Sequence, residues 1–271
     1  MSYRDVVAKT QAYSAYFSFP LTPQETHYWL ITDHPVSSEV LAPYLSELSS
    51  QAKKLRQRLS QQTLEKVKLA SKFVRLARHL PCIELIALTG SIAVGNTRQT
   101  DDIDLLIITA PNTLWLVRPL FLFLLAIKFH RRHPGDNVLR IQDSFCPNLW
   151  LDMSSLALPK NKRNLYTAHE VLQIKPLYDR GGVYQSFLLA NHWTKRFLAN
   201  VYSALVPKRL SPAHIPSVYF VFAPFNVLAF FFQYLYMLPK ITTERVGLHA
   251  AFFHKNDLSR ALIQHLRHNC L

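Results

Sequence analysis

The stretch that decides the fold reads LTGSIAVGNTRQTDDIDL and runs from Leu88 to Leu105. It joins two apolar, strand-like segments, residues 83–88 and 103–109. Only six glycines occur in the chain, and a glycine after a strand lets the backbone come close to a ligand. Ser91 follows Gly90 where it can cap a short helix, whose free N–H groups attract phosphate oxygens. The stretch therefore predicts a strand, a phosphate-binding turn, a short helix and a second strand.

Two aspartates stand at the start of the second strand. Side chains alternate along a strand, so Asp102 and Asp104 are expected on one face, while Ile103 and Leu105 point to the core. Two carboxylates this close repel each other and are best explained by a shared hard cation. Mg²⁺, with Mn²⁺ as the alternative, is commonly held by carboxylates together with substrate phosphates. Asp101 is expected to be a solvated neighbour of this pair.

The Gly-Ser turn, a spacer of about ten residues and the Asp-apolar-Asp strand resemble the signature of the DNA polymerase β-like nucleotidyltransferase superfamily. The resemblance covers about residues 88–108. It implies that Gly90 and Ser91 contact the triphosphate of a bound nucleoside triphosphate. It also implies that Asp102 and Asp104 are catalytic metal ligands.

The same resemblance implies a third carboxylate on a later strand of the sheet. Asp152, flanked by apolar residues, is the expected third catalytic and metal-binding residue. Glu170 is a weaker candidate, because its surroundings are typical of a helix start. Arg98, in the loop before the aspartates, is assigned to the nucleotide phosphates, with a solvent-facing side chain as the alternative. The wider layout resembles a group of bacterial nucleotidyltransferase-domain proteins, in the core and in residues 19–30, 168–179 and 251–254.

The element pattern predicts an α+β fold with three regions. Residues 1–50 read as a helical, helix-turn-helix-like module that binds nucleic acid or docks against protein. Residues 51–160 read as a small mixed-sheet nucleotidyltransferase core with a leading basic helix, and residues 161–271 as a C-terminal helical region. The expected helices are 5–17, 23–30, 51–80 and 114–131, with Thr22 and Glu25 as a capping box, and the further expected strands are 138–141 and 149–153.

Composition points to an anionic partner. Lys and Arg number 31 against 17 Asp and Glu, a formal net charge of +14. Such an excess favours nucleic acid or an anionic membrane surface as a partner. The basic residues of the helix at 51–80 are either a solvated face or a phosphate-backbone contact.

An apolar run at residues 215–238 is long enough to cross a bilayer, but it contains Asn226 and Gln233. Burial inside the protein is favoured for this run, and a membrane-surface position remains open. Three widely spaced cysteines and the absence of a signal-peptide pattern at the start of the chain predict a cytoplasmic protein.

These observations predict a metal-dependent nucleotidyltransferase that moves a nucleoside monophosphate from a nucleoside triphosphate to a hydroxyl acceptor, with RNA favoured. Two alternatives remain. One is a non-catalytic nucleotide- or RNA-binding protein of the same fold, and the other is a protein associated with a membrane surface.

Overall fold

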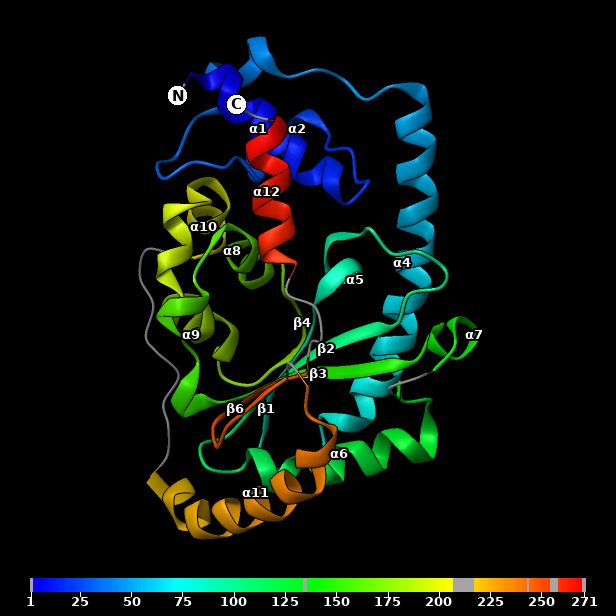
Figure 1. Ribbon diagram of the computed structural model, residues 1–271, viewed down its shortest axis with the longest axis vertical. Helices are drawn as coiled ribbons and strands as arrows, with labels where there is room; N and C mark the ends of the chain where they lie inside the picture. Colours follow the sequence, from blue (N-terminus) through cyan, green and yellow to red (C-terminus); the bar gives the residue numbers. More distant parts are fainter. Residues whose placement is uncertain (1, 134–135, 207–216, 243, 254–257, 270–271) are drawn as a thin grey trace.

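The computed structural model describes residues 2–133, 136–206, 217–242, 244–253 and 258–269. Its centre is a six-stranded mixed sheet in the order β4-β1-β2-β3-β6-β5, with helices around it (Figure 1). This confirms the predicted α+β class. The strands are β1 Ile83–Leu88, β2 Ile103–Thr109, β3 Phe145–Asp152, β4 Lys175–Asp179, β5 Arg245–Val246 and β6 Ala250–Phe252.

The first two strands have the bounds that the sequence predicts. β1 runs antiparallel to β2, and the short helix α5 (Gly90–Val94) lies in their connection. β2 runs parallel to β3, because helix α6 (Leu114–Lys128) carries the chain back across the sheet. Parallel pairing places the starts of β2 and β3 at the same edge of the sheet, and this decides which side chains meet there.

The N-terminal module packs above that edge. It consists of α1 (Tyr3–Tyr16), α2 (Pro23–Tyr28) and α3 (Ser38–Leu41), and α12 (Ser259–Asn269) packs against α1 (Figure 1). The predicted capping box is present, since the Glu25 N–H donates to Thr22 Oγ1 at 3.2 Å and the Thr22 N–H to Glu25 Oε2 at 2.9 Å. The long basic helix α4 (Ser50–Ala77) then descends along the sheet.

The region after residue 160, predicted to be a C-terminal helical region, contains strands as well as helices. It contains α8 (Leu165–Leu172), α9 (Val183–Ala190), α10 (Ala199–Leu205) and α11 (Ala223–Met237), but it also supplies β4, β5 and β6 to the sheet. These short strands depend on pairing with distant strands. Within the described part of the chain, the 3-10 helices are η1 Ala42–Tyr44, η2 Met153–Ser155, η3 Lys160–Lys162, η4 His192–Arg196, η5 Ser217–Phe222 and η6 Leu238–Lys240.

One expected strand is a helix. Residues 138–141 form α7 (Val138–Ile141), because the Asn137 side chain accepts the Arg140 N–H at 3.0 Å and caps a helical turn. Cys82 and Cys146 are free thiols. Cys270 and His254 lie outside the described residues, as do residues 215 and 216 of the apolar run.

Candidate functional site

The Gly90 bend lies directly against Asp104. Gly90 has φ +62°, and a Cβ built on it would stand 2.7 Å from Asp104 Oδ2. A side chain at this position would therefore collide with the carboxylate as well as strain the backbone. The Thr89 N–H also donates to the Asp104 carbonyl at 3.1 Å, which ties the bend to β2. The structure thus brings together the two halves of the motif.

The two aspartates share a side of the sheet with a cysteine. One carboxylate oxygen of Asp102, one of Asp104 and the Cys146 sulfur lie within 4.8 Å of one another. Cys146 is paired with Asp104 in the β2–β3 register. Asn148 Nδ2 donates to Asp104 Oδ1 at 2.5 Å, and its own Oδ1 is buried without a hydrogen-bond partner. Two carboxylates and an orphaned amide oxygen fit a hard divalent cation, and the thiol adds a softer donor.

A cationic side chain closes this group. Arg132 lies just after α6, and its guanidinium donates to Asp102 Oδ2 at 2.5 Å. Asp102 is nearly buried, whereas 42% of the Arg132 side chain is exposed, so the arginine sits at the mouth of the group. Arg132 therefore neutralises one of the two carboxylates from the solvent side.

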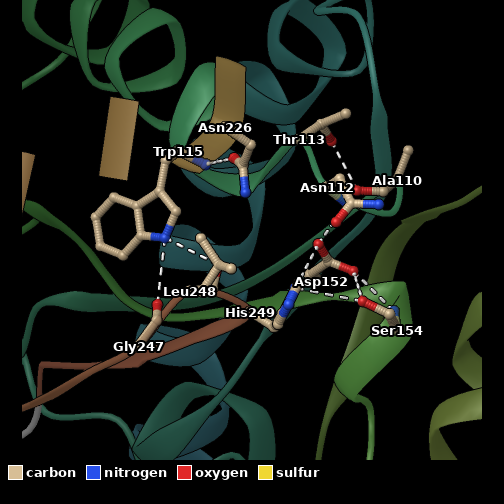
Figure 2. Close-up of polar contacts among 10 residues, drawn as sticks. All are labelled: Ala110, Asn112, Thr113, Trp115, Asp152, Ser154, Asn226, Gly247, Leu248 and His249. Carbon is tan, nitrogen blue, oxygen red and sulfur yellow. Dashed lines mark hydrogen bonds and ion pairs between the residues drawn. The ribbon is translucent and has the colours of Figure 1, made fainter. Parts of the chain in front are cut away.

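Asp152 does not join the pair, contrary to expectation. It pairs with Thr109 at the far end of β3, and the strand rise places it about 20 Å from the Cys146 position. Its buried carboxylate accepts the Asn112 N–H at 2.6 Å and the Ser154 N–H at 2.7 Å, and His249 Nδ1 stands 3.3 Å from it (Figure 2). Asp152 thus holds together the loops at the opposite edge of the sheet. The structure gives it no contact with the aspartate pair.

Asp101 organises the loop that precedes the pair. Its Oδ2 accepts both the Ser91 Oγ–H at 3.0 Å and the Arg98 N–H at 2.9 Å. The Ser91 hydroxyl therefore braces the loop and does not cap α5, whose N-cap is Thr89. The Arg98 side chain is exposed, in line with the solvent-facing alternative.

The site opens into a cavity of about 700 Å³. Gly90, Ser91 and Asp104 line one wall, and side chains of the N-terminal module and α8 line the facing wall. The aromatic members of that facing wall are Tyr13, Phe17, Phe19, Trp29, Tyr166 and His169. Its volume falls in the range typical of small-molecule sites. The module predicted to bind nucleic acid or protein thus lines the same cavity as Asp104.

Electrostatics in the cavity favour binding of a cation. Burial, with the charges of Asp102 and Glu170 added, raises the pKa of Asp104 well above its ordinary value. Burial alone raises the pKa of Glu170 to about 7, and Glu170 lines the same cavity. Acidic groups forced together at a low dielectric gain most from a bound divalent cation.

Comparisons with known proteins add little to this geometry. No family model matches the chain, and the search of curated proteins also finds no match. Among solved structures the chain is similar to one titled "Crystal structure of the toxin-antitoxin with AMP-PNP", at 17% identity and a TM-score of 0.25. That match covers 47% of this chain and 82% of the other. A TM-score this low supports no conclusion about fold or activity.

Four residues at or beside the site were not predicted from the sequence, namely Cys146, Asn148, Arg132 and Lys66, whose Nζ donates to the Asp101 carbonyl at 2.7 Å. Cys146 and Asn148 lie on β3, whose start the sequence analysis placed too late. Arg132 lies in a basic run at residues 130–133, and no local pattern indicates its pairing with Asp102. The burial of Lys66 could have been predicted, because this charged residue stands seven residues from both Leu59 and Phe73 and so lies on the same apolar face of the helix. Leu59, Lys66 and Phe73 are all buried.

Replacement of Cys146 by aspartate is expected to strengthen cation binding. Cys146→Asp places a third hard oxygen ligand beside Asp104, and added ligand charge tightens divalent cation sites. We expect the Kd for Mg²⁺ or Mn²⁺, measured by titration calorimetry, to fall by about tenfold. Cys146→Ser, which keeps the size but adds no charge, is the matched control. An unchanged Kd in Cys146→Asp would place the cation elsewhere.

Proposed function

We propose that this chain is a metal-dependent nucleotidyltransferase that transfers a nucleoside monophosphate from a nucleoside triphosphate to a hydroxyl group. The contact between the Gly90 backbone and the Asp104 carboxylate carries the proposal, because it sets a side-chain-free bend against a cation-binding pair. In this arrangement phosphate oxygens can approach the bend while a cation bridges them to the acids. The cavity provides room for a nucleotide.

The reaction would be an in-line displacement at the α-phosphorus. The acceptor oxygen forms a bond to phosphorus while the bond to the departing pyrophosphate oxygen breaks. Asp102 and Asp104 would hold Mg²⁺ or Mn²⁺, which when bound neutralises charge on the phosphates. The Gly90 backbone admits the phosphates, Arg132 adds positive charge at the mouth, and the facing wall excludes water.

Glu170 is the proposed acceptor for the proton of the attacking hydroxyl. It lines the cavity with Asp104, and its charge contributes to the raised pKa of that residue. A carboxylate with a pKa of about 7 is well matched to a proton transfer near neutral pH. Glu170 thus takes the role for which Asp152 was the first candidate.

An RNA acceptor is favoured by the surface of α4. This helix and its C-cap residue Arg78 expose a series of basic side chains, those of the helix being Lys53, Lys54, Arg58, Lys68, Lys72 and Arg75. The same helix inserts Lys66 beneath the loop that carries Asp101. A polyanion lying along α4 would therefore be held by phosphate contacts close to the site, and its affinity would fall steeply with salt.

A labelling experiment tests the proposal. Purified protein is incubated with Mg²⁺, each α-labelled nucleoside triphosphate and total cellular RNA, beside an Asp102→Asn, Asp104→Asn double variant. Label transferred by the wild type and lost in the double variant supports the proposal. Equal transfer by both proteins would reject the assigned site. The labelled product also identifies the acceptor class, whether RNA, protein or small molecule.

A second candidate function is nucleotide binding without transfer. The observation that favours it is the pairing of Arg132 with Asp102, which occupies one carboxylate with a protein cation, together with Cys146 in place of a third acid. Calorimetry then shows nucleotide binding in the wild type, while no label is transferred to any acceptor. The Arg132→Gln variant separates the two functions, because it frees Asp102 for a metal. Label transfer that appears only in this variant would assign the wild type to binding without transfer.

Glu170→Gln is expected to lower the transfer rate about 10²-fold and to change its pH profile. A group with a pKa of about 7 is ionised above that pH, so the wild-type rate should rise through pH 7 and level off near pH 8. The glutamine cannot ionise, so this rise should disappear. Rates are measured from pH 5.5 to 9 at saturating nucleotide. A rise retained in the variant would exclude Glu170 as the proton acceptor.

A further inference from the structure

Helix α11 exposes its apolar side chains. Among the described residues, Val218–Met237 is long and apolar enough to cross a membrane by length and composition, and only 6% of that window is buried. This differs from the burial favoured by the sequence. Phe225, Leu228 and Phe232 are 55–63% exposed and recur at helical spacing on one face. A helix of a water-soluble protein usually turns such a face toward the core.

The polar residues of the helix point the other way. Asn226 is buried, and its Oδ1 accepts the Trp115 N–H at 2.8 Å in the first turn of α6 (Figure 2). Gln233 Nε2 donates to the Trp115 carbonyl at 2.6 Å, and Arg118 donates to Gln233 Oε1 at 3.1 Å. Asn226 and Gln233, the two polar residues that disfavour a membrane-spanning helix, thus anchor α11 to α6. The amphipathic pattern is inverted, with polar contacts inside and apolar side chains outside.

Helix α6 extends the same surface. It packs along α11 at the end of the molecule opposite the N-terminal module (Figure 1). Leu120, Phe123 and Ile127 are 47–68% exposed at spacings of three and four residues, while the other side of α6 packs in the core. We call the exposed side chains of α6, η5 and α11 the apolar face. Exposed apolar side chains grouped on adjacent helices in this way mark an interaction site.

The charges around the apolar face favour an anionic partner. Residues 114–133 and 217–241 contain no Asp or Glu. Lys128 is exposed at the end of α6, the partly exposed Arg131 lies near Tyr236 at the end of α11, and Arg180, which also pairs with Glu84 at 3.8 Å, lies near Tyr219 before its start. Apolar aromatic residues framed by tyrosines and cations match the interface of an anionic bilayer. A protein partner would not require this combination of features.

We infer that the apolar face docks this protein onto the surface of an anionic lipid bilayer, with α6 and α11 lying in the interfacial plane. A membrane-spanning position of α11 would break the buried Asn226 contact and separate the helix from α6. Insertion from the surface keeps both. Helices α6 and α11 pack on the face of β2 that carries Ile103 and Leu105, whereas Asp104 shares the other face with Leu106, so docking leaves the aspartate side accessible to water-soluble substrates. This inference does not depend on the proposed function.

Flotation with vesicles tests the inference. The full-length protein is mixed with vesicles of phosphatidylcholine containing a minority of phosphatidylglycerol, and with vesicles of phosphatidylcholine alone. We expect the protein to float with the anionic vesicles and more weakly with the neutral ones. Phe123→Ser, Phe232→Ser should lower the partition coefficient at least about tenfold. Leu64→Ser, Leu139→Ser, at exposed leucines of α4 and α7, is the matched control and should bind like the wild type.

Four outcomes would overturn the inference. Wild-type protein that stays below both vesicle layers excludes a lipid partner. A lipid-free dimer in light scattering that the Phe123→Ser, Phe232→Ser variant converts to monomer assigns the apolar face to a second copy. Resistance of vesicle-bound protein to alkaline carbonate extraction assigns α11 to a spanning position. Equal affinity for the two vesicle compositions removes the role of the cations. Far-ultraviolet circular dichroism verifies that each variant is folded, as expected for exposed positions.

Discussion

Gly90→Ala is expected to lower nucleotide transfer by about 10²- to 10³-fold. The new methyl group would stand 2.7 Å from Asp104 Oδ2, so the carboxylate must turn away from its place beside Asp102 and Cys146. If the Asp104 carboxylate leaves its place, the cation is held in the wrong position, and so are the phosphates bound to it. Mg²⁺ affinity by calorimetry and transfer of an α-labelled nucleotide should therefore both fall.

Gly95→Ala provides a matched control for that experiment. Gly95 also has positive φ, at +81°, so alanine strains the backbone there as well, by about 1 kcal/mol. No atom lies within 4 Å of a Cβ built at Gly95, and the residue ends α5 away from the aspartates. Both variants should lose stability through backbone strain, but only Gly90→Ala should lose activity. Equal activity in the two would show that the contact with Asp104 has no functional role.

Local patterns were sufficient to predict the first half of the site. The bounds of β1 and β2, the bend at Gly90 and the shared side of Asp102 and Asp104 all follow from strand alternation and turn chemistry within about twenty residues. No information from distant parts of the chain was needed. The cavity wall above them could not be predicted, because it depends on how the N-terminal module packs.

The position of Asp152, the expected third carboxylate, shows why the second half of the site could not be predicted. Asp152 has the apolar neighbours of a strand residue, and it does lie on β3. Whether the beginning or the end of β3 meets the aspartate pair depends on the direction and register of its pairing with β2. The pairing is parallel, so the beginning meets the pair and Cys146 takes the position opposite Asp104. Glu170 reaches the cavity from α8, through a packing contact that no local pattern predicts.

Lys66→Met is expected to lower the free energy of unfolding by about 2–4 kcal/mol. The Lys66 side chain is 4% exposed, and its Nζ donates to the carbonyls of Gln99 at 3.0 Å and Asp101 at 2.7 Å and to Asp143 Oδ1 at 2.6 Å. Methionine fills a similar volume but leaves these acceptors without a donor. Because 47% of the Asp143 side chain is exposed, water replaces part of that interaction, and most of the loss comes from the two carbonyls.

The same substitution should also weaken the site, because Lys66 joins α4 to the loop that carries Asp101 and to the turn before β3. Asp101 in turn fixes Ser91 and the Arg98 backbone, so the bend and the aspartate pair lose a common support. Urea unfolding followed by circular dichroism measures the stability loss, and calorimetry measures the loss of Mg²⁺ affinity. Lys72→Met removes an exposed lysine from the same helix and should change neither. A Lys66→Met protein as stable as Lys72→Met would mean that the buried ammonium does not hold the loop.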